Sequence, residues 1–378
     1  MDTFLGDLRQ LVECESPSED FAAVARSADV VARVGTARLG VAPERIVLGG
    51  VTHLRWRLGT GPSRVLLVGH HDTVWPTGTL AARPFSVQVG VVRGPGCFDM
   101  LTGVVMAFHA LASLGELDGV TLVVTGDEEL GSPTSRGLIE DEARLASAAL
   151  VLEASADGGA LKTERKGVSL YDVRLHGRAA HAGLEPERGV NATVELAHQA
   201  LAVTAFGNLA RGTTVTPTAA RSGTTTNTVP ATASFAVDAR VRSAAEQERV
   251  DVAMRGLRPV LADSDIELLG GPNRPPLERA MSAALFDRAR RLALELGLPD
   301  FTAAAVGGAS DGNFTAGVGT PTLDGLGAVG GGAHAEHEHV LVEPISGRTA
   351  LLARLVSDLL ADPSAATNDL HTTGAVGP

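Results

Sequence analysis

Residues 64–72 read RVLLVGHHD, an apolar run of strand length that leads directly into two histidines and an aspartate. Two further runs have the same form, VTLVVTG at 120–126 and AALVLE at 148–153, and acidic residues follow or end each of them. Continuous apolar runs of this length are typical of strands buried on both faces, as in a parallel sheet covered by helices. Residues 101–114 (LTGVVMAFHALASL) are apolar nearly all round and predict a buried helix. The pattern therefore favours an α/β domain with a doubly wound, mostly parallel sheet.

The middle of the chain has a different pattern. Residues 168–176 (VSLYDVRLH) alternate like a half-buried strand. We expect the elements after it to be a helix at 189–206, strands at 213–221 and 228–241, a helix at 243–261 and a strand at 265–269. That order, β-α-β-β-α-β, is the ferredoxin-like pattern of a compact domain, and the GGPNRPP stretch at 270–276 marks its end. We therefore expect residues 164–272 to be inserted into a larger domain made of residues 1–163 and 273–378.

Composition excludes several classes of protein. The chain has 378 residues, of which 44% are hydrophobic and 20% charged, an ordinary globular mixture with enough apolar material for a core. Its formal charge of −12 argues against a nucleic-acid partner. Cys14 and Cys97 cannot form a disulfide framework. The N-terminus does not resemble a secretory signal, and no apolar stretch reaches the ~18 residues of a membrane span, so we expect no membrane partner and a cytoplasmic location. Residues 362–378 lack apolar periodicity and are expected to fray.

Metal-type ligands follow the apolar runs. In open parallel sheets, function gathers just past the carboxyl ends of the strands. The candidate residues are His70 and Asp72 after the first run, Glu128 and Glu129 after the second, Glu153 at the end of the third, Asp99 in the RGPGCFD turn and His334 in GGGAHAEHEH. Two histidines with several carboxylates suit zinc, cobalt or manganese. A metal-free site is disfavoured, because so many like charges cannot all stay ionised together.

Strand geometry sorts these ligands. Side chains at i and i+2 share a face of a strand, so His70 and Asp72 can point together while His71 points away. A ligating histidine usually donates its other N–H to a carboxylate, and Asp72 is in position to accept it. Of the adjacent pair Glu128 and Glu129, one can bind metal while the other acts on a water molecule. Any one of these groups of charged residues alone would be ordinary solvated charge. Because such groups recur at the ends of successive strands, the sequence favours a functional site.

Five motifs carry a family resemblance. GHHDTV, GPGCFDM, GDEELGS, VLEAS and GGGAH, in this order, resemble the metal-site motifs of a co-catalytic zinc metallopeptidase family. Its members include glutamate carboxypeptidase, acetylornithine deacetylase, succinyl-diaminopimelate desuccinylase and the aminoacylases. GRAAHAG, PERGVNA, NTVPATASF and DAR in the middle of the chain resemble the lid and dimerisation domain of that family. The ERKG, GGPNRPP and GGASDGN stretches are most similar to the glutamate carboxypeptidase-like branch.

The resemblance implies a role for each residue. Two divalent metal ions are implied, zinc first, with cobalt or manganese as alternatives. Asp99 would bridge them, and the peptide bond after it would be cis. The remaining ligands would be His70 and Glu153 at one metal, and Glu129 and His334 at the other.

The resemblance also implies the catalytic and substrate-binding residues. Asp72 would orient His70, and Glu128 would be the general base. His181 would stabilise the oxyanion, with reach into the active site of a partner subunit in a homodimer built through the inserted domain. Asn227 and Arg240 would hold the substrate, Arg240 by its carboxylate.

Three functions stay open. The first is a carboxypeptidase that releases a C-terminal amino acid, with glutamate as first candidate, from a small peptide or N-acyl substrate. The second is an N-acyl-amino-acid deacylase, which would use the same site with a different pocket. The third is a catalytically inactive dimeric binding protein of the same fold. The third arises because Leu101 and Thr102 stand where the family commonly has lysine followed by glycine or alanine.

Overall fold

The structure is a computed structural model that describes residues 1–362. The sequence predicts a frayed end from residue 362 onward, and residues 363–378 of that segment lie outside the described residues. The chain divides into two compact units. The large unit contains Met1–Glu164, Leu277–Val306 and the chain from Ser310; the inserted unit contains Arg165–Pro276 and Gly307–Ala309. The inserted unit thus ends later than the expected boundary at 272 and also takes in a short later segment.

A six-stranded sheet forms the centre of the large unit, with strand order β1-β2-β6-β3-β7-β16. Strands β6, β3, β7 and β16 run parallel, while β1 and β2 form an antiparallel edge. The strands span Glu44–Leu48 (β1), Val51–Leu58 (β2), Val65–His70 (β3), Val120–Thr125 (β6), Ala148–Val151 (β7) and Thr322–Leu323 (β16). All three apolar runs of the sequence are thus parallel strands, and every residue of each strand is buried.

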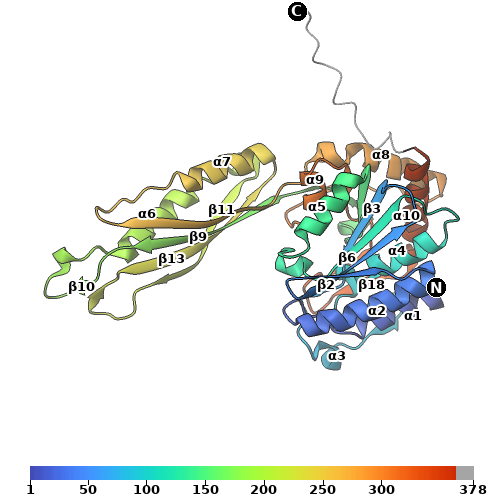
Figure 1. Ribbon diagram of the computed structural model, residues 1–378, viewed down its shortest axis with the longest axis horizontal. Helices are drawn as coiled ribbons and strands as arrows, with labels where there is room; N and C mark the ends of the chain where they lie inside the picture. Colours follow the sequence, from blue (N-terminus) through green and yellow to red (C-terminus); the bar gives the residue numbers. More distant parts are fainter. Residues whose placement is uncertain (363–378) are drawn as a thin grey trace, which may run out of the picture. The chain divides into compact units, whose positions relative to one another are not determined.

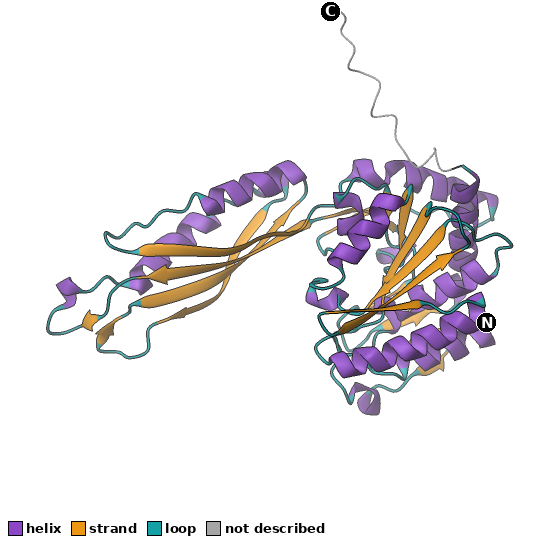
Figure 2. Ribbon diagram, in the orientation of Figure 1, coloured by secondary structure: helices purple, strands orange, loops and turns teal. Residues whose placement is uncertain are grey.

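Helices cover both faces of this sheet (Figure 2). Alternate side chains of the strands point to opposite faces: Val65 and Leu67 pack in the larger core and Leu66 and Val68 in the smaller one. The larger core is shared with α1 (Asp2–Val12), α2 (Phe21–Leu39), α4 (Thr102–Ala112), α8 (Arg279–Glu295) and α10 (Glu343–Ala361). Helices α5 (Arg136–Leu145) and α9 (Gly312–Gly317) lie on the other face. The α/β class predicted from the sequence is confirmed.

Helix α4 lies very close to the end of β7. A Cβ atom at Gly103 would lie 2.0 Å from the carbonyl oxygen of Leu152. Only a residue without a side chain permits this approach, because the obstacle is backbone and cannot rotate away. The helix itself begins after an irregular turn, Cys97–Leu101, in which Asp99 and Met100 have non-helical backbone angles.

A buried charge ties three helices together on the larger core. Asp7 of α1 is 5% exposed. Its carboxylate accepts two hydrogen bonds from Arg38 of α2, at 2.6 and 2.9 Å, and lies 2.8 Å from Nε2 of His109 on α4. Burial alone would raise the pKa of Asp7, but the hydrogen bonds from Arg38 and His109 outweigh it and hold the pKa below its ordinary value.

The inserted unit is a four-stranded antiparallel sheet of order β11-β13-β9-β14. Helices α6 and α7 pack on the same face of it (Figure 1). Val173, Phe235 and Met254 are buried together between these helices and the sheet. The elements are β9 (Gly167–His176), α6 (Ala192–Thr204), β11 (Thr214–Ser222), β13 (Thr232–Val241), α7 (Ala244–Arg255) and β14 (Asp265–Arg274). Their order along the chain is β-α-β-β-α-β.

Three element boundaries in this unit differ from the expected ones by four or more residues. Helix α7 ends at Arg255 rather than 261, because Gly256 and a following proline do not favour helix. The strand expected at 228–241 is interrupted at Pro230, which leaves a short β12 (Thr228–Val229) that pairs with β10 (Ala180–His181). Strand β14 continues through 270–274, because its pairing with β9 persists there and an edge strand tolerates proline.

Smaller elements complete the chain. The large unit has a second sheet of order β17-β18-β5-β4 and a strand pair of β15 and β8. The bounds are Gly330–Gly331 (β17), His339–Leu341 (β18), Val91–Arg93 (β5), Ser86–Gln88 (β4), Ala303–Val306 (β15), Leu161–Arg165 (β8) and Thr79–Ala82 (α3). Within residues 1–362, none of the helices combines the length and apolar character that crossing a bilayer requires.

Candidate metal centre

The candidate ligands meet at the carboxyl edge of the parallel strands. His70 is the last residue of β3, and Glu153 lies two residues after the end of β7. Glu129 belongs to a short 3₁₀ helix, Glu128–Leu130, that follows β6. Because β3 lies between β6 and β7 and all three run parallel, their carboxyl ends open onto one place.

Asp99 lies between two histidines that come from distant parts of the sequence. Its Oδ1 lies 3.4 Å from Nε2 of His70, and its Oδ2 lies 3.3 Å from Nε2 of His334. Each carboxylate oxygen thus faces a different imidazole, an arrangement in which one carboxylate can serve two cations. The peptide bond between Asp99 and Met100 is cis, as expected.

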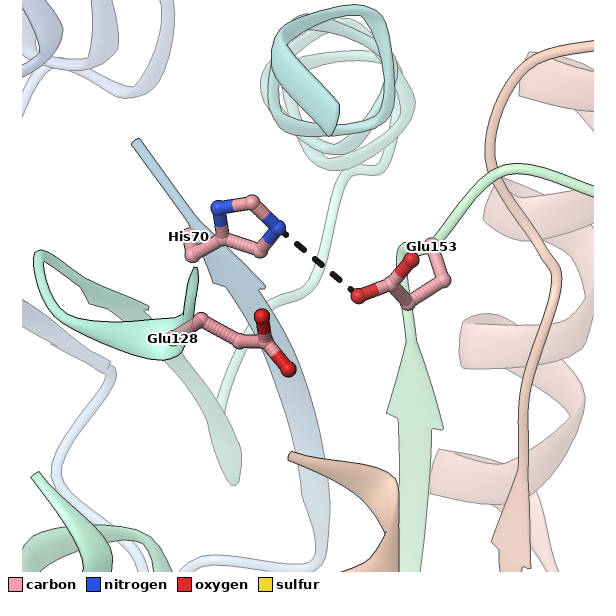
Figure 3. Close-up of side chains that lie close together, drawn as sticks. All are labelled: His70, Glu128 and Glu153. Carbon is pink, nitrogen blue, oxygen red and sulfur yellow. Dashed lines mark ion pairs between the residues drawn. The ribbon is translucent and has the colours of Figure 1, made fainter. Parts of the chain in front are cut away.

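Glutamates complete the surroundings of both histidines. Glu153 Oε1 lies 3.7 Å from Nε2 of His70 (Figure 3), and Glu129 Oε2 lies 3.0 Å from Nε2 of His334. The ligand atoms of His70, Glu128 and Glu153 lie within 4.8 Å of one another, as do those of His70, Asp99 and Glu129. The carboxylate of Glu128 therefore belongs to the same cluster as the expected ligands.

The state of the His70 ring fits a cation site. Its Nδ1 lies 2.9 Å from the backbone carbonyl oxygen of Asp72, which can only accept, so the Nδ1 atom carries a proton. Nε2 is buried and has no hydrogen-bond partner among the described residues 1–362. In the neutral ring its lone pair would face the carboxylates of Asp99 and Glu153, which is unfavourable unless a cation lies between them.

The charges around both histidines act in the same direction. Burial lowers the pKa of His70, but the carboxylates of Asp72 and Asp99 outweigh it and raise the pKa well above its ordinary value. Asp99 and Glu129 raise the pKa of His334 to about 10. A field that retains a proton so strongly also attracts a divalent cation, and two histidines among carboxylates suit zinc, cobalt or manganese.

Asp72 connects to the segment after β6 that carries two of the candidate residues. Its Oδ1 accepts a hydrogen bond from the backbone N–H of Glu128, and its Oδ2 accepts one from that of Glu129, both at 3.2 Å. The carboxylate was expected to hold the His70 ring, but the nearer acceptor is the backbone oxygen of Asp72, while Oδ1 lies 3.4 Å from Nδ1. His71 points away, as its i+1 position requires, and its Nδ1 lies 3.2 Å from Ser27 Oγ.

Two supports of this cluster were missed in the sequence. Ser18 donates its hydroxyl to Asp72 Oδ2 at 2.6 Å. Asp311 accepts hydrogen bonds from the hydroxyls of Thr125, at 3.0 Å, and Ser132, which flank the acidic turn after β6. Asp311 lies in the GGASDGN stretch, so an acid there was visible, but nothing in the sequence indicated which loop it would contact.

The other three candidate residues belong to the inserted unit. His181 is exposed in β10, whose pairing with β12 brings it close to Asn227, which is also exposed. Arg240 of β13 donates to both carboxylate oxygens of Asp238, at 2.7 and 2.8 Å. It pairs with Val168 near the start of β9. His181 lies beyond the other end of β9, in the separate pair of strands β10 and β12, so Arg240 and His181 lie toward opposite ends of β9.

Comparisons with known proteins agree with this site. The sequence pattern of Peptidase family M20/M25/M40 matches residues 66–358. Carboxypeptidase G2 from Pseudomonas sp. (strain RS-16) is 32% identical over 293 residues, which are 74% of this chain and 70% of that protein. The chain therefore belongs to Peptidase family M20/M25/M40. It is a hydrolase of that family. The metallopeptidases of the family use divalent metals, and the chain has a cluster of residues that could hold them. Membership in this family disfavours the inactive binding protein considered above.

Solved structures show the same fold. Aminopeptidase PepT from Bacillus cereus ATCC 10987 aligns with a TM-score of 0.70 and 20% identity, over 95% of this chain and 98% of that one. The M20 family metallo-carboxypeptidase Sso-CP2 from Sulfolobus solfataricus aligns with a TM-score of 0.69 and 15% identity, over 94% and 99%. At these identities the similarity concerns the fold alone.

Proposed function

We propose that this chain is a metal-dependent amide hydrolase of the carboxypeptidase type that holds two divalent cations. The observation that carries the proposal is the position of Asp99, whose two oxygens face His70 and His334 separately. His70 and Glu153 would hold one cation, with zinc as the first candidate, and Glu129 and His334 the other. Asp99 would be shared by both.

The cations would supply positive charge that polarises the scissile carbonyl and makes a water molecule a better nucleophile. Glu128 is the proposed general base, which takes the proton of the attacking water and passes it to the leaving nitrogen. Two observations support this role. Its carboxylate lies in the cluster with His70 and Glu153, and its backbone N–H is fixed by Asp72. A base must be both close and oriented, and this anchoring meets the second requirement.

Arg240 is the proposed anchor for the substrate carboxylate. Arginine binds a carboxylate through two parallel N–H···O bonds, and Asp238 already engages the guanidinium in this way. Asp238 would keep the guanidinium plane fixed in the free enzyme. The substrate carboxylate would bind the N–H groups of Arg240 that Asp238 leaves free, or it would compete with Asp238 for the others. Asn227, which lies close to His181, would add a polar contact to the substrate alongside His181.

His181 is the proposed donor to the oxyanion, and the sheet geometry supports its action in a homodimer. From Val168, which pairs with Arg240, to His176 the strand β9 advances roughly 26 Å at about 3.3 Å per residue. His181 lies beyond that end. One small substrate therefore cannot contact both Arg240 and His181 of the same inserted unit. A second copy of the chain would supply one of the two.

The substrate class follows from the relative and from the proposed anchor. Carboxypeptidase G2 is by its name a carboxypeptidase, and an arginine that binds a terminal carboxylate suits the release of a C-terminal amino acid. Glutamate is the first candidate for that residue. An N-acyl-amino-acid deacylase would use the same cluster and differ only in the pocket for the acyl group.

The test combines metal analysis with a substrate panel. Metal per chain is measured by elemental analysis for the wild type and for Asp99→Asn, and turnover is measured on dipeptides and N-acyl amino acids that end in acidic or apolar residues. We expect two metal ions in the wild type, fewer in the variant, and highest kcat/KM on peptides with a C-terminal glutamate. Wild-type protein that binds no metal, or Asp99→Asn that retains two ions, would refute the proposed centre. Preference for N-acyl amino acids would favour the deacylase instead.

A further inference from the structure

Glu338 is a buried acid next to the candidate centre whose role the proposed function does not include. It follows His334 by four residues and directly precedes β18. Its side chain is only 2% exposed. Its Oε1 accepts hydrogen bonds from the backbone N–H groups of Phe98 at 2.8 Å and Asp99 at 3.2 Å. Its Oε2 accepts one from the backbone N–H of Gly96 at 2.9 Å and one from the indole of Trp75 at 2.8 Å.

All four partners of this carboxylate are N–H donors. A buried carboxylate is costly unless its oxygens are fully hydrogen-bonded, and here each oxygen accepts two bonds. The donors come from two different segments. Residues 96–99 form the turn that carries Asp99, and Trp75 lies in the segment that follows His70 and Asp72. Glu338 thus links both of these to the segment that carries His334.

The turn at 96–99 has the shape needed to enclose an anion. Gly96 adopts a left-handed backbone conformation, with φ of +73°. A Cβ atom there would lie 2.5 Å from the Thr73 side chain. Successive N–H groups of such a turn can converge on one anion. The N–H of Asp99 is one of them, so the position of this backbone depends directly on the carboxylate.

Trp75 is itself held in place on its other side. The guanidinium of Arg83 lies over the indole ring, 3.7 Å from its centroid. Arg83 also donates to the backbone oxygen of Glu336 at 3.3 Å. Arg83 thus covers one face of the indole whose N–H donates to Glu338.

We propose that Glu338 is a positioning residue of the metal centre, whose carboxylate fixes Asp99 between His70 and His334. The inference rests on the proposed function in one respect, that Asp99 holds metal. Glu338 does not touch substrate or metal in this role. Its carboxylate fixes the backbone from which the shared ligand projects, and it joins that backbone to the segment of the second histidine. Residues that hold ligands in this way typically contribute about 10–100-fold to metal affinity.

Glu338→Gln is the informative variant because it preserves shape. Glutamine has one acceptor oxygen and one NH₂ donor. If its oxygen keeps the Phe98 and Asp99 bonds, the NH₂ group faces the N–H groups of Gly96 and Trp75. If the glutamine oxygen instead keeps the Gly96 and Trp75 bonds, the NH₂ group faces the N–H groups of Phe98 and Asp99. If Glu338 merely filled space, glutamine would leave metal affinity unchanged. If its carboxylate must accept four N–H donors, glutamine would lower metal affinity.

Glu195 provides a matched control in the inserted unit. It is fully buried, and its carboxylate accepts bonds from the backbone N–H groups of Val260 and Leu261, from the hydroxyl of Ser264 and from the amide of Gln199. Glu195→Gln therefore removes a buried, fully hydrogen-bonded carboxylate of the same kind, in the inserted unit and away from the candidate metal ligands. It should lower thermal stability and leave metal affinity unchanged.

The experiment measures Zn²⁺ affinity by competition with a chelating dye for wild type, Glu338→Gln, Glu195→Gln and Trp75→Phe. Thermal unfolding of the metal-free proteins and the visible spectrum of their Co²⁺ forms are recorded in parallel. We expect a loss of about 10–100-fold in affinity for Glu338→Gln, with a changed Co²⁺ spectrum. Trp75→Phe removes one of four donors and should cause a smaller loss in the same direction.

The outcomes separate this inference from the proposed function. Wild-type protein without metal would overturn the proposed function and this inference with it. Wild-type protein that binds metal, together with Glu338→Gln of equal affinity and unchanged spectrum, would overturn the inference alone. Should Glu338→Gln not fold, Trp75→Phe decides, and unchanged affinity and spectrum in that variant would overturn the proposal.

Discussion

Replacement of Glu128 by glutamine is the sharpest test of the catalytic proposal. The side chain is 7% exposed, and its ligand atoms lie within 4.8 Å of those of His70 and Glu153. Glutamine preserves the volume and the backbone bond to Asp72 but cannot take up a proton from water. General-base catalysis contributes about 10²–10⁴-fold, which corresponds to about 2.7–5.4 kcal/mol at 1.36 kcal/mol for each tenfold. Burial favours the upper part of this range, because few water molecules can replace the lost base.

The assay is steady-state kinetics at saturating metal with the best substrate of the panel. We expect kcat to fall by about 10³–10⁴-fold with KM changed little, while elemental analysis still finds the wild-type metal content. Asp141→Asn is the control, because it removes one negative charge from a side chain that is 77% exposed on α5. A kcat within tenfold of wild type would refute the role of Glu128 as base. A loss of metal along with activity would instead make Glu128 a ligand.

Three further predictions concern assembly and stability. His181→Ala and Arg240→Ala should each be inactive, and an equal mixture after subunit exchange should recover roughly a quarter of wild-type activity, since half of the dimers then contain one intact site; no recovery would contradict a shared site. Gly103→Ala places a Cβ atom 2.0 Å from a backbone oxygen and should lower the free energy of unfolding by about 1–3 kcal/mol or more. Gly137→Ala on α5, with no atom within 4 Å of the added carbon, should be neutral or stabilising, and equal melting temperatures of the two variants would refute this. Asp7 has a lowered pKa because the hydrogen bonds from Arg38 and His109 outweigh the effect of burial, so its contribution to stability is present above its unfolded pKa and is lost as pH falls through the folded pKa. The difference in unfolding free energy between wild type and Asp7→Asn should therefore shrink below about pH 4, and a constant difference from pH 7 to pH 3 would contradict it.

The departure after Asp99 leaves the cluster geometry intact. Leu101 and Thr102 are both buried at the start of α4, and the hydroxyl of Thr102 donates to the backbone oxygen of Cys97 at 2.6 Å. The two residues therefore have a local role in the turn that carries Asp99. Nothing in the structure shows how their presence in place of the common lysine and small residue alters rate or specificity.

Sequence patterns were most informative where burial is continuous. The three apolar runs are the parallel strands β3, β6 and β7, because a strand covered on both faces is apolar at nearly every position. The carboxyl ends of parallel strands share one edge, so candidate ligands that follow each run had to lie near one another. Boundaries at half-exposed elements were less predictable. Strand β14 extends through glycines and a proline because its pairing with β9 persists, which no local pattern indicates.

The sequence by itself determined the α/β class, the parallel strands and the residue types at their ends, because each follows from burial and from short spacings along the chain. Only the tertiary structure decided which groups support those residues. Glu338 contacts the turn of Asp99 across 239 positions, and Asp311 reaches Ser132 across 179. It also decided that Asp238 engages Arg240, and that His181 lies beyond the end of β9 opposite to Arg240. Such contacts depend on how distant segments pack, and a buried carboxylate finds its donors only after the chain has folded around it.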